Sequence, residues 1–430
     1  MKLFQQMLVA GASMSLLAPM AVQASEYVNL EEINSYSRSD SKTARFDNKT
    51  FINSTNEDKA DINSIDVLQG IEAGGFSDTT VLDGKAIFAV GAIDGNDTLD
   101  DGEALTTPYV YQMNLNTSFT GDDNLYVRLK TGAGWTDWIN KPLYHIEGTS
   151  YTDTVAVDKI WYTFPLGDKF TATIGPKIEN YYMLAATPSV YKPGALKAFK
   201  LGSHSSAFGA STSTGAGITY KADNGFASSV TVNSKLAKSS TGLFTNDDQT
   251  KINVQTAYTA DNYHVSATYS KQRGWNSWSY YSTKDLSNGA GTTGANATKS
   301  DSLALRAWWR PEETGTATPS ISVGYDIIDF GLTHDNGVAE GSGYFVGLNW
   351  ADMFQPEDKV GLAVGQPMKA TSATAGNTLT EVDPFIWEFY YSFRPNDSIE
   401  VTPAIFGGTD VWENDDEDMF GAVVTTTFKF

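Results

Sequence analysis

The sequence predicts an all-β protein, a 16-stranded antiparallel transmembrane β-barrel with short periplasmic turns and long external loops. Three observations predict this fold. Sixteen stretches alternate apolar and polar side chains, the connections between them alternate in length, and the chain ends inside such a stretch, FGAVVTTTFKF. Because side chains of a strand point to opposite faces with a period of two, each stretch presents one apolar face.

The first 24 residues are predicted to be a secretory signal peptide. Lys2 is followed by an apolar stretch and then by Val22, Gln23 and Ala24, a small-residue cleavage pattern. Residues 25–75 are polar and are predicted to form a periplasmic segment, and residues 76–430 the barrel domain. No apolar run after the signal has the length of a membrane-spanning helix.

Composition excludes several classes of protein. The 430 residues include no cysteine, so an exported chain must fold without disulfides. The formal net charge of -21 argues against nucleic acid as a partner. The chain is rich in strand-forming residues, with 10 Trp, 21 Tyr and 22 Phe.

The connections between the predicted strands alternate between short and long. The strands are predicted at 84–93, 109–119, 124–132, 157–166, 169–176, 214–222, 225–235, 250–259, 262–271, 301–310, 318–330, 342–351, 358–366, 384–394, 398–408 and 419–430. The short connections are rich in Gly, Asn, Asp or Pro, as tight turns require. The long ones lie near 94–108, 133–156, 177–213, 236–249, 272–300, 331–341, 367–383 and 409–418. An even strand number with every long loop at one end is typical of bacterial outer-membrane barrels.

The two faces of the strands support the same fold. Tyr109, Tyr111 and Met113 alternate with Gln112 and Asn114, so the first set is expected to face lipid. A ring of sixteen strands is too wide for side chains to fill, which favours a polar, water-filled interior. Seven tryptophans near strand ends are candidates for the membrane interfaces, with ordinary strand or loop packing as the alternative: Trp135, Trp138, Trp161, Trp275, Trp278, Trp350 and Trp412.

Several long stretches resemble a known family. They are FSDTTVLDGKAIFAVGAI (76–93), LNTSFTGDDNLYVRLKTG (115–132), VGLNWADMFQPEDKVGLAVGQPMKATSA (346–373), DPFIWEFYYSFRPNDSIEVTPAIF (383–406) and the closing VVTTTFKF. These stretches are similar to the cyanobacterial outer-membrane porins, the Som-type or iron-uptake porins of the OprB-like carbohydrate-selective porin family.

The resemblance implies a channel in contact with outer-membrane lipid and lipopolysaccharide that passes inorganic ions and small solutes, with iron and sugars as suggested substrates. Members of the family usually carry an S-layer-homology module that binds cell-wall polymer. Residues 25–75 are too short for one, so peptidoglycan binding is not expected. A homotrimer is expected only by analogy with general porins.

A channel needs no catalytic group, cofactor or bound metal; the charges of its lumen set which solutes enter. The pore-lining candidates are Gln112, Asn114, Asn116, Arg128, Lys130, Arg306, Arg310, Glu388, Arg394 and Glu400. This predicted wall is basic, while the acidic surplus lies in loops, at 94–103 and 413–418.

The longest connection, residues 177–213, lies between the fifth and sixth predicted strands, where general porins fold a loop inward. Its cationic candidates for a constriction are Lys192, Lys197, Lys200 and His204. The alternative is an external loop that grips its neighbours, since length alone is a weak sign of function.

The sequence thus predicts a porin for passive diffusion of inorganic ions, iron among them, and of small hydrophilic solutes. A carbohydrate-selective channel is the first alternative. A secreted soluble β binding protein is a second, and an outer-membrane lipase using His264 and Ser266 a third. Because those two side chains are predicted to point into the lumen, away from lipid, no enzyme activity is expected.

Overall fold

The computed structural model describes residues 79–94, 104–135, 138, 143–204, 206–209, 211–275, 281–283, 286, 297–331, 337–379, 383–411 and 418–430. The chain divides into two compact units. Residues 82–118 and 123–430 form the barrel, and the other unit comprises 1–81 and 119–122, of which only 79–81 and 119–122 are described. The predicted signal peptide and polar segment lie outside the described residues.

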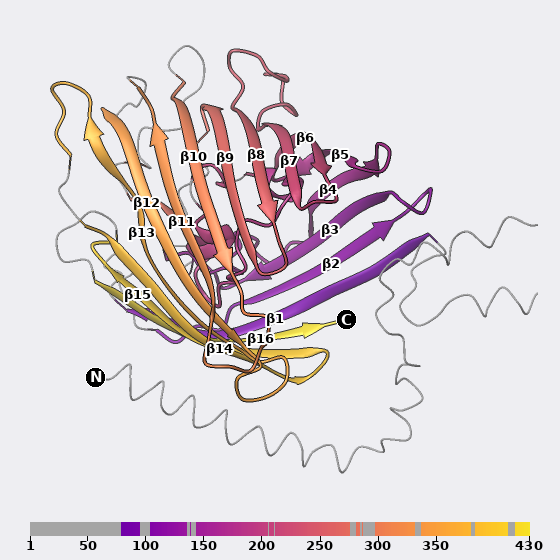
Figure 1. Cartoon of the computed structure of the whole chain (residues 1–430), viewed down its shortest axis with the longest axis vertical. Helices are drawn as coiled ribbons and strands as arrows, with labels where there is room; N and C mark the ends of the chain where they lie inside the picture. The colour runs from indigo at the N-terminus through magenta and orange to yellow at the C-terminus, as the bar shows by residue number, and fades with distance from the viewer. Residues whose placement is uncertain are drawn as a thin grey trace, which may run out of the picture. The chain divides into compact units, whose positions relative to one another are not determined.

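Sixteen antiparallel strands form one closed sheet, which confirms the predicted fold (Figure 1). Their bounds are β1 Thr80–Asp94, β2 Tyr109–Thr117, β3 Asn124–Ala133, β4 Ala156–Pro165, β5 Phe170–Ile178, β6 Ser213–Lys221, β7 Phe226–Ser234, β8 Thr250–Thr259, β9 Tyr263–Arg273, β10 Lys299–Trp309, β11 Ser320–Asp329, β12 Val338–Ala351, β13 Lys359–Ala373, β14 Phe385–Asn396, β15 Ile399–Thr409 and β16 Met419–Lys429. Each lies where a strand was predicted, and the largest difference is β13, which extends to Ala373.

The last strand closes the barrel on the first. β1 and β16 pair in an unbroken antiparallel register from Lys85 opposite Lys429 to Asp94 opposite Phe420. The edge of β16 is covered by β1, so neither edge of the sheet is left exposed. Every other strand pairs with its neighbours in sequence.

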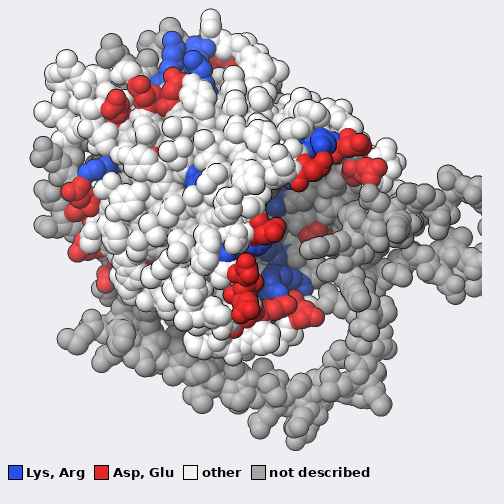
Figure 2. Space-filling model, viewed as in Figure 1, with Lys and Arg blue, Asp and Glu red and all other residues white. Residues whose placement is uncertain are grey.

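The outward faces of the strands are apolar, as the alternation predicts. On β9, Tyr263 and Val265 are 44% and 50% exposed, while the alternating residues His264 and Ser266 are buried on the inner side. Charged side chains are sparse over the strand faces seen in Figure 2 and gather at their edges. Among the described residues, no helix has the length and apolar character to cross a bilayer.

The hydrophobic core lies inside the barrel, where loops pack against the inner faces of strands. Phe345 on β12, Tyr390 on β14 and Phe406 on β15 belong to this core together with loop residues such as Leu196 and Phe199. The prediction of a polar interior is therefore wrong wherever loops pack against the inner faces of the strands. A wide barrel does not need to leave its interior to water when its own loops fill part of it.

The tryptophans correct a second prediction. Trp135 and Trp275 are 1% exposed and belong to the inner core, not to a membrane interface. Each follows a glycine with positive φ, Gly134 at 77° and Gly274 at 62°, directly after the end of a strand. The left-handed backbone conformation turns the chain sharply, and glycine adopts it at no steric cost. Trp138 is equally buried.

The other predicted interface tryptophans have different positions. Trp161 lies on the inner face of β4, stacked on Tyr126 of β3 with ring centroids 4.3 Å apart. Trp350 is half-buried and donates from its indole nitrogen to the carbonyl oxygen of Ala317 at 2.9 Å. Trp278 and Trp412 lie outside the described residues.

Candidate functional site

The connection between β5 and β6, residues 179–212, is the inner loop. It contains two short 3-10 helices, η4 Asn180–Met183 and η5 Lys197–Gly202, which lie within the ring of strands in Figure 1. Its outgoing limb follows the inner wall: Ala185 donates to Ser229 of β7, Ala186 exchanges two hydrogen bonds with Gln255 of β8, and the amides of Val190 and Tyr191 both donate to Ser322 of β11. The wall from β7 to β11 therefore holds the loop in place.

The tip of the inner loop is fixed by Glu388 of β14. Its carboxylate, 0% exposed, accepts four hydrogen bonds of 2.7–3.2 Å, from the hydroxyl of Tyr191 and from the amides of Gly194, Ala195 and Leu196. Hydrogen bonds to an ionised acceptor are stronger than neutral ones and satisfy a buried carboxylate. Glu388 was predicted to line the pore; it faces inward, but the loop covers it.

The returning limb is held by buried cations. Arg306 of β10 donates to the carbonyl oxygens of Leu201 and Ser203, each at 3.1 Å, and to both carboxylate oxygens of Asp326 at 2.9 Å. Arg306 and Asp326 have no exposed side-chain surface. Lys251 of β8 donates to the carbonyl oxygens of Ser206 and Gly209. Arg306, another predicted pore-lining residue, thus serves as an anchor that solvent does not reach.

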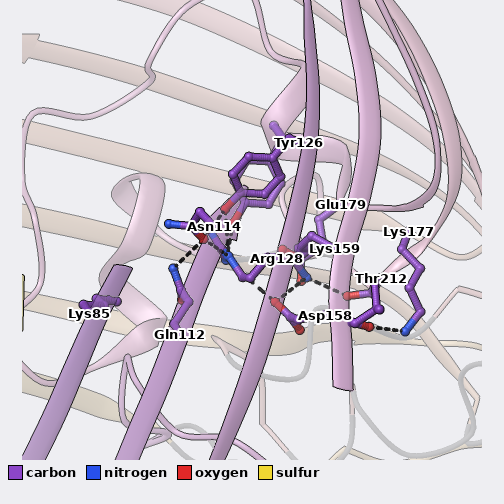
Figure 3. A network of polar contacts seen from close by, with 12 residues as sticks. Lys85, Gln112, Asn114, Tyr126, Arg128, Asp158, Lys159, Lys177, Glu179 and Thr212 are labelled. Atoms are coloured by element: carbon purple, nitrogen blue, oxygen red, sulfur yellow. Dashed lines mark hydrogen bonds and ion pairs between the residues drawn. The ribbon is translucent and has the colours of Figure 1, made fainter. Parts of the chain in front are cut away.

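Opposite the wall that holds the inner loop, strands β1 to β4 present a row of charged side chains to the lumen (Figure 3). Arg128 of β3 donates to Asn114 at 3.2 Å and to the hydroxyl of Tyr126 at 2.8 Å, and lies 3.7 Å from Asp158. Lys159 of β4 pairs with Glu179 at 3.1 Å. All of these distances join side-chain nitrogen and oxygen atoms.

The inner loop adds two lysines to this row. Lys197 and Lys200 lie within electrostatic range of Lys159 and of the carboxylates Glu147 and Glu179. The ammonium of Lys200 lies 4.1 Å from the ring centre of Tyr181. We call the following set the charged passage: Lys85, Arg128, Lys130, Lys159, Lys197 and Lys200 with Glu147, Asp158 and Glu179.

The loop groups of the charged passage have shifted pKa values. Burial raises the pKa of Glu179, but Lys159, Lys200 and Lys197 together hold it down at about 2. Burial likewise opposes ionisation of Glu147, and Lys85 nevertheless lowers its pKa to about 2. Burial lowers the pKa of Lys200 to about 8, against the opposite effect of Glu179. At neutral pH the carboxylates are ionised and Lys200 is largely protonated.

An aromatic stack borders the charged passage. Trp161 lies between Tyr126 and Tyr182, with ring centroids 4.3 and 4.9 Å away. Gly175 of β5 makes room for the indole, because a Cβ at that position would lie 2.4 Å from the Cβ of Trp161. The hydroxyl of Tyr182 accepts from Arg128 at 3.4 Å. The stack therefore places aromatic rings beside a guanidinium group.

The sequence did not identify Asp158, Lys159 or Glu179 as site residues, and it placed Trp161 at a membrane interface instead of beside the charged passage. The register between β3 and β4 shifts between Arg128 and Leu129, a bulge that breaks the alternation on β4 and brings both Asp158 and Lys159 to the same network. No bulge is visible in a count of alternate residues. Lys85 follows the alternation of β1 and was open to prediction.

The remaining predicted residues lie beside the charged passage or away from it. Lys130 and Gln112 face each other on β3 and β2, and Asn116 donates to Asp83 at 2.9 Å. Arg310 is exposed and donates to the carbonyl oxygen of Asp261, at the short-turn end of the barrel. His204 is 1% exposed, and burial holds its pKa well below the usual value, so it presents no cation to the lumen.

Arg394 and Glu400 lie at the short-turn end, in contact with each other. Arg394 is 3.2 Å from Glu400 and 2.6 Å from Glu357, and Lys429 is 2.9 Å from Glu400. Lys192, at the tip of the inner loop, lies within electrostatic range of Lys359 in this region.

The described residues contain no group of three or more His, Cys, Asp or Glu side chains arranged to hold a metal ion. Most of the two acidic loops predicted at 94–103 and 413–418 lies outside the described residues. His264 accepts or donates a hydrogen bond with Thr259 at 2.7 Å and stacks on Trp308, so its ring packs on the inner wall.

Comparison with known proteins identifies a matching family. The family described as carbohydrate-selective porin, OprB family, matches residues 68–429. An uncharacterized protein of Nostoc sp. is 28% identical over 401 residues, which cover 84% of this chain and 67% of the relative. An uncharacterized protein of Synechocystis sp. is 23% identical over 369 residues, which cover 77% of this chain and 65% of the relative. The chain thus spans about two thirds of the length of these relatives.

A solved structure shares the fold. The high-pH structure of Pseudomonas putida OprB superposes with a TM-score of 0.58 at 12% identity, over 82% of this chain and 94% of that one.

Proposed function

Because the chain belongs to the carbohydrate-selective porin family OprB, we propose that it forms a water-filled outer-membrane channel for passive diffusion of small hydrophilic solutes, with sugars as the preferred class. The short-turn end then faces the periplasm and the long loops face outward. A cleaved signal peptide at residues 1–24 and a homotrimer belong to the same proposal. Catalysis has no place in it.

One observation carries the proposal: the inner loop lies against β7 to β14, so the charged passage and its aromatic stack border the remaining lumen. A sugar has hydroxyl groups for hydrogen bonds and an apolar C–H face for an aromatic ring. Arg128 and Asn114 supply polar groups beside Tyr182, which is 37% exposed. Ligand sites commonly combine aromatic surface with a few fixed polar groups.

A channel for inorganic ions is the broader alternative. The charges of the lumen support iron as a solute less well than they support sugars. Six cationic side chains against three carboxylates give the charged passage a net positive charge. A free ferric ion would be repelled by this passage, whereas anionic ferric citrate would not. Sugars, being neutral, meet no such barrier.

Solute flux through the refolded barrel tests the proposal. Liposomes containing the protein are expected to swell in isosmotic glucose, and planar bilayers to show stable single-channel conductance. Deleting residues 185–205 should raise the conductance, since the inner loop would no longer fill the lumen. A folded barrel without conductance would contradict the proposal.

The preference for sugars has its own test. Trp161→Ala is expected to slow glucose flux by about threefold or more while KCl conductance changes little, because the aromatic contact is lost but the charges stay. Trp350→Ala, at the short-turn end, is the matched control. Equal effects of the two variants on glucose would argue against a sugar contact at Trp161.

A further inference from the structure

The short-turn end of the lumen holds a second group of cations, which no part of the proposed function uses. We call it the exit cluster: Lys192, Lys359, Arg394 and Lys429 with the carboxylates Glu357 and Glu400. Lys359 begins β13, Arg394 lies near the end of β14, and Lys429 ends β16. The cluster adjoins the charged passage, because Lys429 is the cross-strand partner of Lys85.

Only part of this positive charge is neutralised by neighbouring side chains. One oxygen of Glu400 is shared by Arg394 at 3.2 Å and Lys429 at 2.9 Å, and Glu357 contacts Arg394 at 2.6 Å. Lys359 lies within electrostatic range of three cations, Lys192, Arg394 and Lys429, and of two carboxylates, Glu400 and Asp352. Gathering like charges is unfavourable unless an anion joins them.

The tip of the inner loop is built to hold Lys192 in this place. The hydroxyl of Tyr390 donates to the carbonyl oxygen of Lys192 at 2.7 Å and accepts from Asn349 at 3.1 Å. Gly194 lets the backbone pass over the Tyr390 ring, because a Cβ there would lie 2.3 Å from it. The Lys192 side chain itself stays exposed. Its backbone is thus fixed while its side chain remains accessible to solvent.

From this arrangement we propose that the exit cluster is a binding subsite for a small multivalent anion, a phosphate or polycarboxylate group, at the periplasmic end of the channel. Lys192 approaches from the loop and Lys359 from the wall, with Arg394 and Lys429 beside them. Ammonium and guanidinium groups donate charge-assisted hydrogen bonds to such oxygens. The sidedness of the subsite rests on the orientation given under the proposed function.

Binding measurements on the refolded barrel in detergent test the subsite without requiring a conducting channel. Titration with inorganic phosphate is expected to show saturable binding that weakens by about tenfold in Lys192→Gln/Lys359→Gln, since two charge-assisted contacts are lost. A second titration uses glucose 6-phosphate. If its affinity equals that of inorganic phosphate, the phosphate group alone is the ligand. If its affinity is higher, the ligand is a phosphorylated solute. Either result supports the subsite.

Lys169→Gln is the matched control, because Lys169 lies on a turn at the same end and pairs with exposed Asp223. Equal binding by wild type and the double variant, with both folded by heat-modifiable electrophoresis, would overturn the proposal. Loss of binding in the control as well would also overturn it, since the effect would then come from surface charge. Conductance is measured in parallel. Phosphate binding without conductance would refute the channel but not the subsite. Conductance without phosphate binding would refute the subsite but not the channel.

Discussion

The carboxylate of Glu388 on β14 accepts a hydrogen bond of 2.7 Å from the hydroxyl of Tyr191, 197 residues earlier in the chain. Three amides of the same loop complete its coordination. One buried carboxylate therefore fixes the tip of a long loop across the lumen, and with it the positions of Lys192 and Lys197. We therefore expect the width of the lumen to depend on this attachment.

Glu388→Gln is expected to loosen the inner loop. The loop directs four hydrogen-bond donors at this position, and the NH2 group of a glutamine side chain cannot accept from them. Each donor left unsatisfied costs about 1–3 kcal/mol. Single-channel recordings should show larger and noisier conductance, and trypsin should cleave after Lys197 sooner. Glu340→Gln removes an exposed carboxylate at the far end of β12 and serves as control. Identical recordings for both variants would contradict the role given to Glu388.

Arg306→Met is expected to destabilise the barrel by about 3–5 kcal/mol, since it removes the guanidinium group that pairs with the buried carboxylate of Asp326. Heat-modifiable electrophoresis would report this as unfolding at a lower temperature. Arg306→Met/Asp326→Leu should recover part of the loss, because no isolated charge is then buried. Arg310→Met, on an exposed turn, should stay near wild type. If the double variant were no more stable than Arg306→Met, the argument from the buried ion pair would be wrong.

The anion preference of the channel is expected to fall as pH rises from 7 to 9. Lys200 has a pKa lowered to about 8 by burial, so its positive charge is present below that pH and is lost above it. Glu147 and Glu179, with pKa values of about 2, stay ionised throughout this range. Zero-current potentials under a KCl gradient would measure the change.

Lys200→Met is the control for that titration, and its zero-current potential should depend less on pH over the same range. Lys200 is one of six cations of the charged passage, so the change assigned to it is partial. A wild-type preference that does not vary between pH 7 and 9 would show that Lys200 does not face the permeating ions.

Much of the site was open to prediction from residue order. Alternation placed Arg128, Lys130 and Asn114 on the inner face, and the length and position of residues 177–213 marked the loop that lies inside. Sequence order gave no means to distinguish an inward residue that meets water from one that meets the loop. Arg306 and Glu388 have the same alternation as Arg128, yet both are buried.

The sequence by itself determined the barrel: the sixteen strands, their faces, the short and long connections, and the closing strand. These features are local, since a period of two and a turn composition are set by neighbouring residues. Only the tertiary structure decided which wall the inner loop covers, where Trp135 and Trp275 go, and that Asp158 and Lys159 share one network. Those outcomes depend on contacts between residues far apart in the chain, which form only once the barrel has closed.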